Sequence, residues 1–145
     1  MKQSGRASII TIAAIASILL VVSLFAFSKE SVASVGGRFM QALAAGDVDT
    51  LTKMTYLGNR SEDEMRKQWE FTVNTAGKYY KFRYAIMGGV QSSADTASVR
   101  MQVLRSADSG GGYEENFQLP LVKVGNEWKV DISAASRQLY PGLPR

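Results

Sequence analysis

The chain contains no cysteine and no histidine among its 145 residues. Without cysteine it can form neither disulfide bonds nor a thiolate nucleophile, and it cannot carry a lipoprotein anchor. Without histidine it lacks a common zinc ligand and the base of every Ser-His-Asp triad. We therefore expect no metal and no cofactor. A mass of 15.8 kDa leaves room for one domain and an appendage.

A large excess of one charge is also missing. The formal net charge is +4, and residues 31–145 carry 14 basic and 12 acidic side chains, so this part of the chain is nearly neutral. Proteins that bind nucleic acid usually present a strongly basic surface. We therefore expect no nucleic-acid partner.

One long apolar run stands near the start of the chain. Residues 8–27 include no charged side chain, and as a helix they would extend about 30 Å, the thickness of the hydrocarbon core of a bilayer. The run predicts a transmembrane helix. A cleaved signal peptide is the alternative, because Lys2 and Arg6 form a basic start and residues 31–33 resemble a cleavage site. The length of the run favours an anchor that is not cleaved.

The charges beside this run predict its orientation. Residues 1–7 form a basic flank, which the positive-inside rule places in the cytoplasm. The chain would then cross the cytoplasmic (inner) membrane once, and its C-terminal domain would lie in a periplasm or an equivalent compartment. Ala13 and Ser17 have the spacing of small residues through which membrane helices pack. We therefore expect the bilayer and other membrane protein subunits as partners.

Three helices are predicted after the apolar run. Apolar residues at spacings of three and four predict the first over residues 31–45, which a glycine ends. Asp47 is a typical N-cap for a short helix over residues 48–54. Residues 61–64 form a capping box for a third helix that extends to about residue 75.

The apolar residues then recur at every second position, which predicts strands. The four strands cover residues 78–87, 97–104, 113–124 and 127–132. Gly88 should end the first strand, and Pro120 predicts an edge position or a bulge in the third. Helices followed by a meander of strands predict an α+β domain over residues 28–132, with about three helices packed on a four-stranded antiparallel sheet. Residues 133–145 are expected to form an extended tail.

Two segments resemble a known family. The sequence Phe-Met-Gln-Ala-Leu-Ala-Ala-Gly-Asp at residues 39–47 resembles the opening of nuclear transport factor 2-like domains, which are cone-shaped members of the cystatin-like group. Residues 117–130 resemble the closing hairpin of the same domains, and the chain is most similar to exported, lumazine-binding-like members of unknown function. The resemblance implies this fold over roughly residues 32–132. The family includes isomerases, dehydratases, transport factors and scaffolding subunits, so the fold alone implies no activity.

The interior of the predicted cone suggests a place for a ligand. Enzymes of the family hold acid and base groups there, and an active site in this chain would need a carboxylate beside Tyr80 or Tyr84. The alternation assigns no carboxylate to the inward positions, so we predict no catalytic residue and no enzyme. Five aromatic residues could line a ligand cavity, or could simply pack on one another as core: Trp69, Tyr80, Tyr84, Phe117 and Trp128.

The outward face of the strands suggests a different function. It gathers four basic residues that could contact a partner or merely be solvated: Lys81, Arg83, Arg100 and Lys129. Our first hypothesis is therefore a non-catalytic, membrane-anchored, extracytoplasmic interaction domain that serves as an accessory or assembly subunit of a membrane complex. The alternative is a protein that binds a small apolar or aromatic ligand inside the cone.

Overall fold

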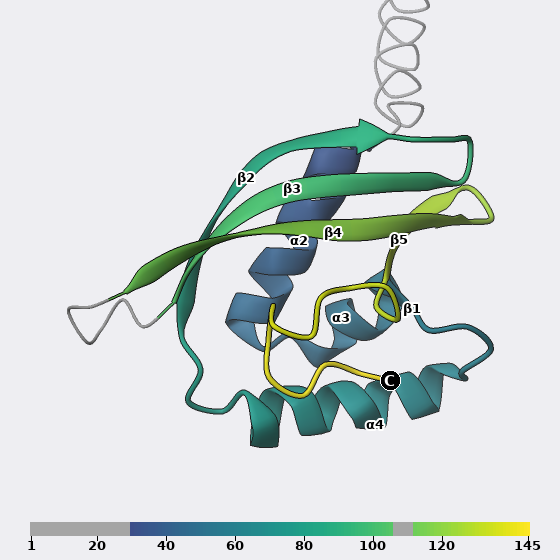
Figure 1. The fold of residues 1–145 in the computed structure, drawn as a ribbon. Coiled ribbons are helices and arrows are strands. Elements are labelled where there is room, and N and C mark those ends of the chain that lie inside the picture. Colours follow the sequence, from purple (N-terminus) through teal and green to yellow (C-terminus); the bar gives the residue numbers. More distant parts are fainter. Residues whose placement is uncertain (1–29, 106–111) are drawn as a thin grey trace, which may run out of the picture. The chain divides into compact units, whose positions relative to one another are not determined.

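The computed structural model describes residues 30–105 and 112–145. The apolar run at residues 8–27, with Ala13 and Ser17, lies outside these ranges. Among the described residues, no helix is long and apolar enough to cross a membrane. The chain divides into two units at residue 30, and the second unit contains the helices and strands labelled in Figure 1.

Three α-helices precede the long strands, as predicted: α2 (Val32–Ala45), α3 (Val48–Met54) and α4 (Glu62–Phe71). Their caps confirm the predictions from sequence. Gly46 ends α2 with a left-handed φ of 66°, and the side chain of Asp47 caps α3. Ser61 and Glu64 form both bonds of the capping box of α4. A π-helical turn, η1 (Thr72–Ala76), continues α4 to the position where the third helix was expected to end.

The sheet corrects the predicted fold class. It has five strands: β1 (Thr55–Tyr56), β2 (Phe82–Gln91), β3 (Thr96–Arg105), β4 (Tyr113–Val124) and β5 (Glu127–Asp131). Their order is β1-β5-β4-β3-β2, and β1 pairs with β5 in parallel. The prediction of four antiparallel strands is therefore wrong, and the sheet is mixed. Strand β1 is two residues long, too short to show an alternating pattern in the sequence.

Two details of the predicted strands need comment. Strand β2 does not end at Gly88, as expected, but continues to Gln91, with a bulge between Ile86 and Gly88. Strand β4 is an interior strand, and it has no bulge at Pro120 because its register with β3 is unbroken. On the side of β5, however, Pro120 has no paired neighbour, because that pairing begins only at Leu121, so the proline occupies a local edge.

The core lies between the concave face of the sheet and the helices. The sheet arches over the helices, and α2 crosses beneath β2 and β3 (Figure 1). Phe39 of α2 and Val99 of β3 are completely buried. A Cβ atom at Gly36 would come within 2.6 Å of a Val99 methyl group. Glycine therefore sets how closely α2 approaches the sheet.

The C-terminal segment is part of this core. Residues 133–145 follow a series of turns instead of the expected extended tail, and Leu139, Tyr140 and Leu143 are buried. Arg137 closes the last turns, because its Nη1 donates hydrogen bonds to the carbonyl oxygens of Leu143 and Pro144 at 3.2 and 2.8 Å. The packed domain therefore includes these residues.

Candidate functional site

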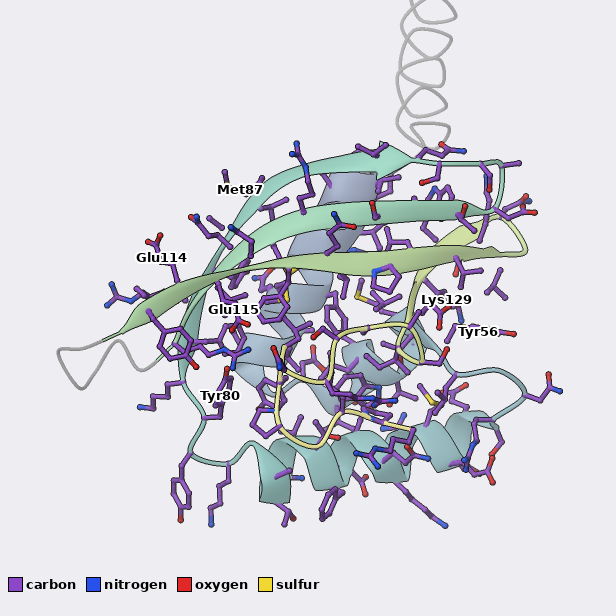
Figure 2. All side chains as sticks on the ribbon, viewed as in Figure 1. Tyr56, Tyr80, Met87, Glu114, Glu115 and Lys129 are labelled. Carbon is purple, nitrogen blue, oxygen red and sulfur yellow. The ribbon has the colours of Figure 1, made fainter. Side chains whose placement is uncertain are left out.

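The alternation of side chains brings charged residues onto the concave face at one end of the sheet. Arg105 lies two positions after the buried Val103 in β3, and Glu115 lies two positions before the buried Phe117 in β4. Residues two positions apart share a face of a strand. Figure 2 shows Glu115 on the concave side and its neighbour Glu114 on the convex side. A pair of opposite charges therefore ends an otherwise apolar face.

Aromatic residues surround these charges. Arg105 pairs with Phe82 of β2 on one side and with Tyr113 of β4 on the other. Tyr80 lies two positions before Phe82, and Tyr140 comes from the C-terminal segment. We call the whole group the end cluster: Tyr80, Phe82, Arg105, Tyr113, Glu115 and Tyr140.

Three rings of the end cluster pack on one another. The ring of Tyr80 lies 5.2 Å from that of Tyr140 and 5.9 Å from that of Phe82, and the rings of Phe82 and Tyr140 are 6.0 Å apart between centroids. Both contacts of Tyr140 are edge-to-face, an arrangement that aromatic pairs favour. The hydroxyl of Tyr140 donates to the carbonyl oxygen of Gly77 at 3.3 Å. The rings are therefore held in defined orientations.

The guanidinium of Arg105 is fixed from several sides. Its Nη2 lies 3.1 Å from Oε2 of Glu115, and the side chains are 15% and 31% exposed. The same nitrogen donates to the carbonyl oxygen of Gln138 in the C-terminal segment. The guanidinium carbon lies 5.3 Å from the ring centre of Phe117 and 5.9 Å from that of Tyr113. These contacts hold the plane of the guanidinium in place.

Two polar atoms of the end cluster are buried without a hydrogen-bond partner. They are Oη of Tyr80 and Nε of Arg105, and they are the only such side-chain atoms in residues 30–105 and 112–145. Nearly all buried polar groups of folded proteins are hydrogen-bonded, because an unpaired group loses its bonds to water. Both atoms of this kind therefore fall within a single group of six residues.

Burial controls the protonation of the two inner tyrosines. Burial raises the pKa of Tyr80; the positive charge of Arg105 lowers it, and Tyr113 and Glu115 raise it again, so the net shift is upward. Burial also raises the pKa of Tyr140, and the nearby Tyr80 adds to this shift. Tyr80 therefore keeps its proton at neutral pH and can donate it to a hydrogen bond.

The structure brings some of the five candidate lining residues together. The rings of Tyr80 and Tyr84 both contact Phe82, and that of Tyr84 does so at 6.2 Å. Phe117 borders the same group through Arg105.

The two tryptophans lie elsewhere in the domain. Trp69 is completely buried, packs against Phe39 at 6.1 Å, and donates from Nε1 to Oγ1 of Thr55 at 2.9 Å. Trp128 lies at the β4–β5 hairpin, where Lys123 sits over its ring at 5.4 Å. The observed cluster therefore contains neither of them.

The sequence prediction missed the charged members of the end cluster. It assigned no carboxylate to the inward positions, whereas Glu115 lies on the concave face, near enough to Tyr80 to shift its pKa. The signal was present in the sequence. In β4, the inward positions before Phe117 are Glu115 and Tyr113, and in β3 the inward position after Val103 is Arg105. The prediction assigned only the apolar residues in the middle of each strand to the inward face, because the residues at the strand ends are polar.

The convex face carries two of the four predicted interface residues. Arg83 of β2 and Arg100 of β3 are exposed there, and Arg100 is paired with Gly88. Between them along β2, the side chain of Met87 is 57% exposed (Figure 2). Lys81 is exposed in the connection before β2.

The fourth predicted interface residue lies apart from these. Lys129 of β5 lines a surface hollow of about 380 Å³ with Tyr56, Lys53 and Arg60. Figure 2 shows Lys129 and Tyr56 at the opposite side of the domain from Tyr80. Among the described residues, no group of three acidic side chains is arranged to hold a metal ion.

Comparison with known proteins finds solved structures at low sequence identity. No family profile and no curated protein sequence matches the chain. Solved structures do match. A ketosteroid isomerase-like protein from Erwinia carotovora atroseptica is 20% identical, with 67% of this chain and 85% of that chain covered and a TM-score of 0.47.

Two further matches are to proteins of unknown function. An NTF-2 like protein of unknown function from Shewanella oneidensis is 15% identical, with 66% of this chain and 88% of that chain covered and a TM-score of 0.44. A protein of unknown function from Mycobacterium tuberculosis is 12% identical, with 67% and 63% covered and a TM-score of 0.45.

Proposed function

We propose that residues 31–145 form a ligand-binding domain that holds a small aromatic molecule at the end cluster. The observation that carries this proposal is the position of the two unpartnered buried atoms, Tyr80 Oη and Arg105 Nε, beside three mutually packed rings. Small-molecule sites combine mostly apolar walls with a few fixed polar groups. The end cluster has this composition, and its polar groups are held by an ion pair and ring contacts.

Nuclear magnetic resonance on the full chain in detergent micelles tests this proposal. We use acetophenone and cumene, two single-ring compounds of similar shape. Binding at the end cluster should shift the backbone amide signals of Phe82, Arg105 and Tyr113 in a saturable way. Partition of a probe into the micelle would also shift the amide signals of β5, whereas binding at the end cluster would not. The amides of β5 therefore serve as the internal control. If neither probe gives saturable shifts at the end cluster, the proposal is wrong.

Protein interaction through the convex face is a second candidate function. Met87 and Val90 are both more than half exposed on β2, and Arg83 and Arg100 flank them. Exposed apolar residues beside charges are typical of interaction surfaces. Replacement of Met87 by lysine should release a bound subunit that co-purifies with the native chain in mild detergent. A chain that purifies alone argues against this function.

We also propose that the apolar segment at residues 8–27 attaches the domain to the cytoplasmic membrane, with the domain outside the cytoplasm. The absence of charge over this segment and the basic residues before it support the proposal. The full chain should stay in the membrane pellet after alkaline carbonate washing. A chain that starts at residue 28 should appear in the soluble fraction, and a native chain in that fraction would contradict the proposal.

A further inference from the structure

A surface hollow lies beside β5, where the neighbouring strand β1 is too short to cover it. Strand β1 pairs only with Val130 and Asp131, so in the described part of the chain no strand lies on that side of residues 127–129. The end of α3 and the start of α4 surround this gap and leave a hollow of about 380 Å³, which we call the β5 hollow. The short β1 therefore creates the space.

Three positive charges from separate segments line the β5 hollow. Lys53 belongs to the last turn of α3, Arg60 to the connection between β1 and α4, and Lys129 to β5. The carboxylates of Glu62 and Glu127 also line it. The ion pairs that the structure gives for residues 30–105 and 112–145 include none of these five side chains. Because the three like charges repel one another, an anion bound in the hollow would be stabilised.

The arrangement of the charges indicates which kind of anion fits. A phosphate monoester carries a charge of about −1.5 to −2 at neutral pH and has three strong acceptor oxygens. Three cations on separate segments can each donate to one of these oxygens, whereas a carboxylate offers two oxygens and a single charge. The two glutamates leave the hollow with an excess of one positive charge, which disfavours long polyanions such as nucleic acid.

The size and the remaining lining of the hollow fit a small molecule. Its volume lies within the range of small-molecule sites, which is about 300–1,000 Å³. The half-buried Tyr56 and the buried Leu57 and Met65 contribute apolar surface to its walls. Such a surface can contact the carbon skeleton of a ligand while the cations hold its charged group.

We propose that the β5 hollow is a binding site for a phosphate monoester, and that Lys53, Arg60 and Lys129 hold its phosphate group. Glu62 and Glu127 tune the site, because their negative charges lower its affinity for anions in general. The site is separate from the end cluster, since Figure 2 shows Lys129 and Tyr80 at opposite sides of the domain. The inference therefore does not depend on the function proposed above.

Three small probes test the inference by nuclear magnetic resonance on the full chain in uncharged detergent micelles. Glycerol 3-phosphate carries the phosphate monoester, glycerol lacks it, and glycerate has a carboxylate on a skeleton of the same length. Glycerol 3-phosphate should give saturable shifts of the amides of Tyr56, Gly58 and Lys129. Glycerate should bind at least about threefold more weakly, because it offers one charge fewer, and glycerol should give no saturable shift. The amides of Phe82 at the end cluster are the internal control.

Single-charge variants assign the binding to the hollow. Lys129→Gln should weaken the binding of glycerol 3-phosphate about three- to fivefold, as expected for one partly exposed ion pair. Lys78→Gln removes the same charge two positions before Tyr80, at the other side of the domain, and is the matched control. Glu127→Gln should tighten binding about twofold, because it removes a like charge beside the phosphate. Amide spectra without probe confirm that each variant is folded.

A lipid headgroup could supply the same phosphate monoester. The full chain in phosphatidylcholine nanodiscs, with and without phosphatidic acid, distinguishes this source from a free metabolite. Shifts of the hollow amides with glycerol 3-phosphate identify a soluble ligand. Shifts with phosphatidic acid alone, lost in Lys129→Gln and kept in Lys78→Gln, identify the lipid. Both results support a phosphate monoester site.

Three outcomes would overturn the inference. In the first, neither glycerol 3-phosphate nor phosphatidic acid shifts the amides of the hollow. In the second, glycerate binds as tightly as glycerol 3-phosphate, so the site does not select phosphate. In the third, Lys129→Gln and Lys78→Gln weaken binding equally, which indicates attraction to the overall charge of the domain and no defined site.

Discussion

The concave face of the sheet has two ends, and strands β3 and β4 contribute to both. At one end, which we call the covered end, the inward residues are apolar and at most 5% exposed: Ala97, Val99, Leu119, Leu121 and Val130. At the other end, the same alternation places Arg105 and Glu115 of the end cluster on the concave face. The ends differ in what packs against them.

The packing partners explain this difference. Helix α2 lies against β2, β3 and β5, and the side-chain-free Gly36 lets it approach Val99 closely. At the end cluster the C-terminal segment packs against the strands instead: it contributes Tyr140 to the cluster, and the carbonyl oxygen of Gln138 accepts from Arg105. A segment of turns leaves more backbone and side-chain polar groups near a sheet than a helix does. The covered end thus supplies stability, and the end cluster is free to carry polar groups.

The largest expected effect comes from adding a side chain at Gly36, where α2 approaches the covered end most closely. Gly36→Ala places a methyl group 2.6 Å from Val99 and should lower the free energy of unfolding by about 2 kcal/mol, even after the gain in helix propensity. Gly37→Ala is the control, because its Cβ would lie 3.9 Å from Ile86, an ordinary contact. It should leave stability unchanged or raise it by up to about 1 kcal/mol. Urea unfolding of the full chain measures both, and equal effects would contradict the close packing of α2.

The next effect tests the hydrogen bond between Trp69 of α4 and Thr55 of β1, which pairs with Val130 of the covered end. Thr55→Val keeps the shape of the side chain but leaves Nε1 of the buried Trp69 without its acceptor, and it also removes the hydrogen bond that Oγ1 donates to the carbonyl oxygen of Leu51. An unsatisfied buried donor costs about 1.5 kcal/mol, which should appear as a lower urea midpoint. Acetophenone affinity at the end cluster should not change. A loss of acetophenone affinity would show that the two ends are not independent.

The covered end was much easier to predict from sequence than the end cluster. Buried apolar residues at alternating positions, such as Val99 and Leu119, give a clear strand pattern, and the caps at Asp47 and Ser61 have local signatures. The end cluster depends on Tyr140, which lies 60 residues along the chain from Tyr80 and reaches it only through tertiary packing. The same is true of β1, whose two residues become a strand only because β5 lies beside them.

The smallest expected effect is a pH dependence of stability that originates in the end cluster. The pKa of Tyr80 is raised by burial, so the folded protein holds this proton more tightly than the unfolded chain does. Stability from Tyr80 is therefore fully present below the ordinary pKa of tyrosine, about 10, and is lost as the pH rises through the higher pKa of the folded state. Tyr80→Phe should flatten the fall of the urea midpoint above about pH 10, although Tyr140 retains its own contribution. Tyr79→Phe is the control, because that side chain is 85% exposed. A Tyr80→Phe profile as steep as that of Tyr79→Phe would mean that the Tyr80 hydroxyl is solvated in the folded protein, and with it the argument for an unpartnered donor at the end cluster would fail.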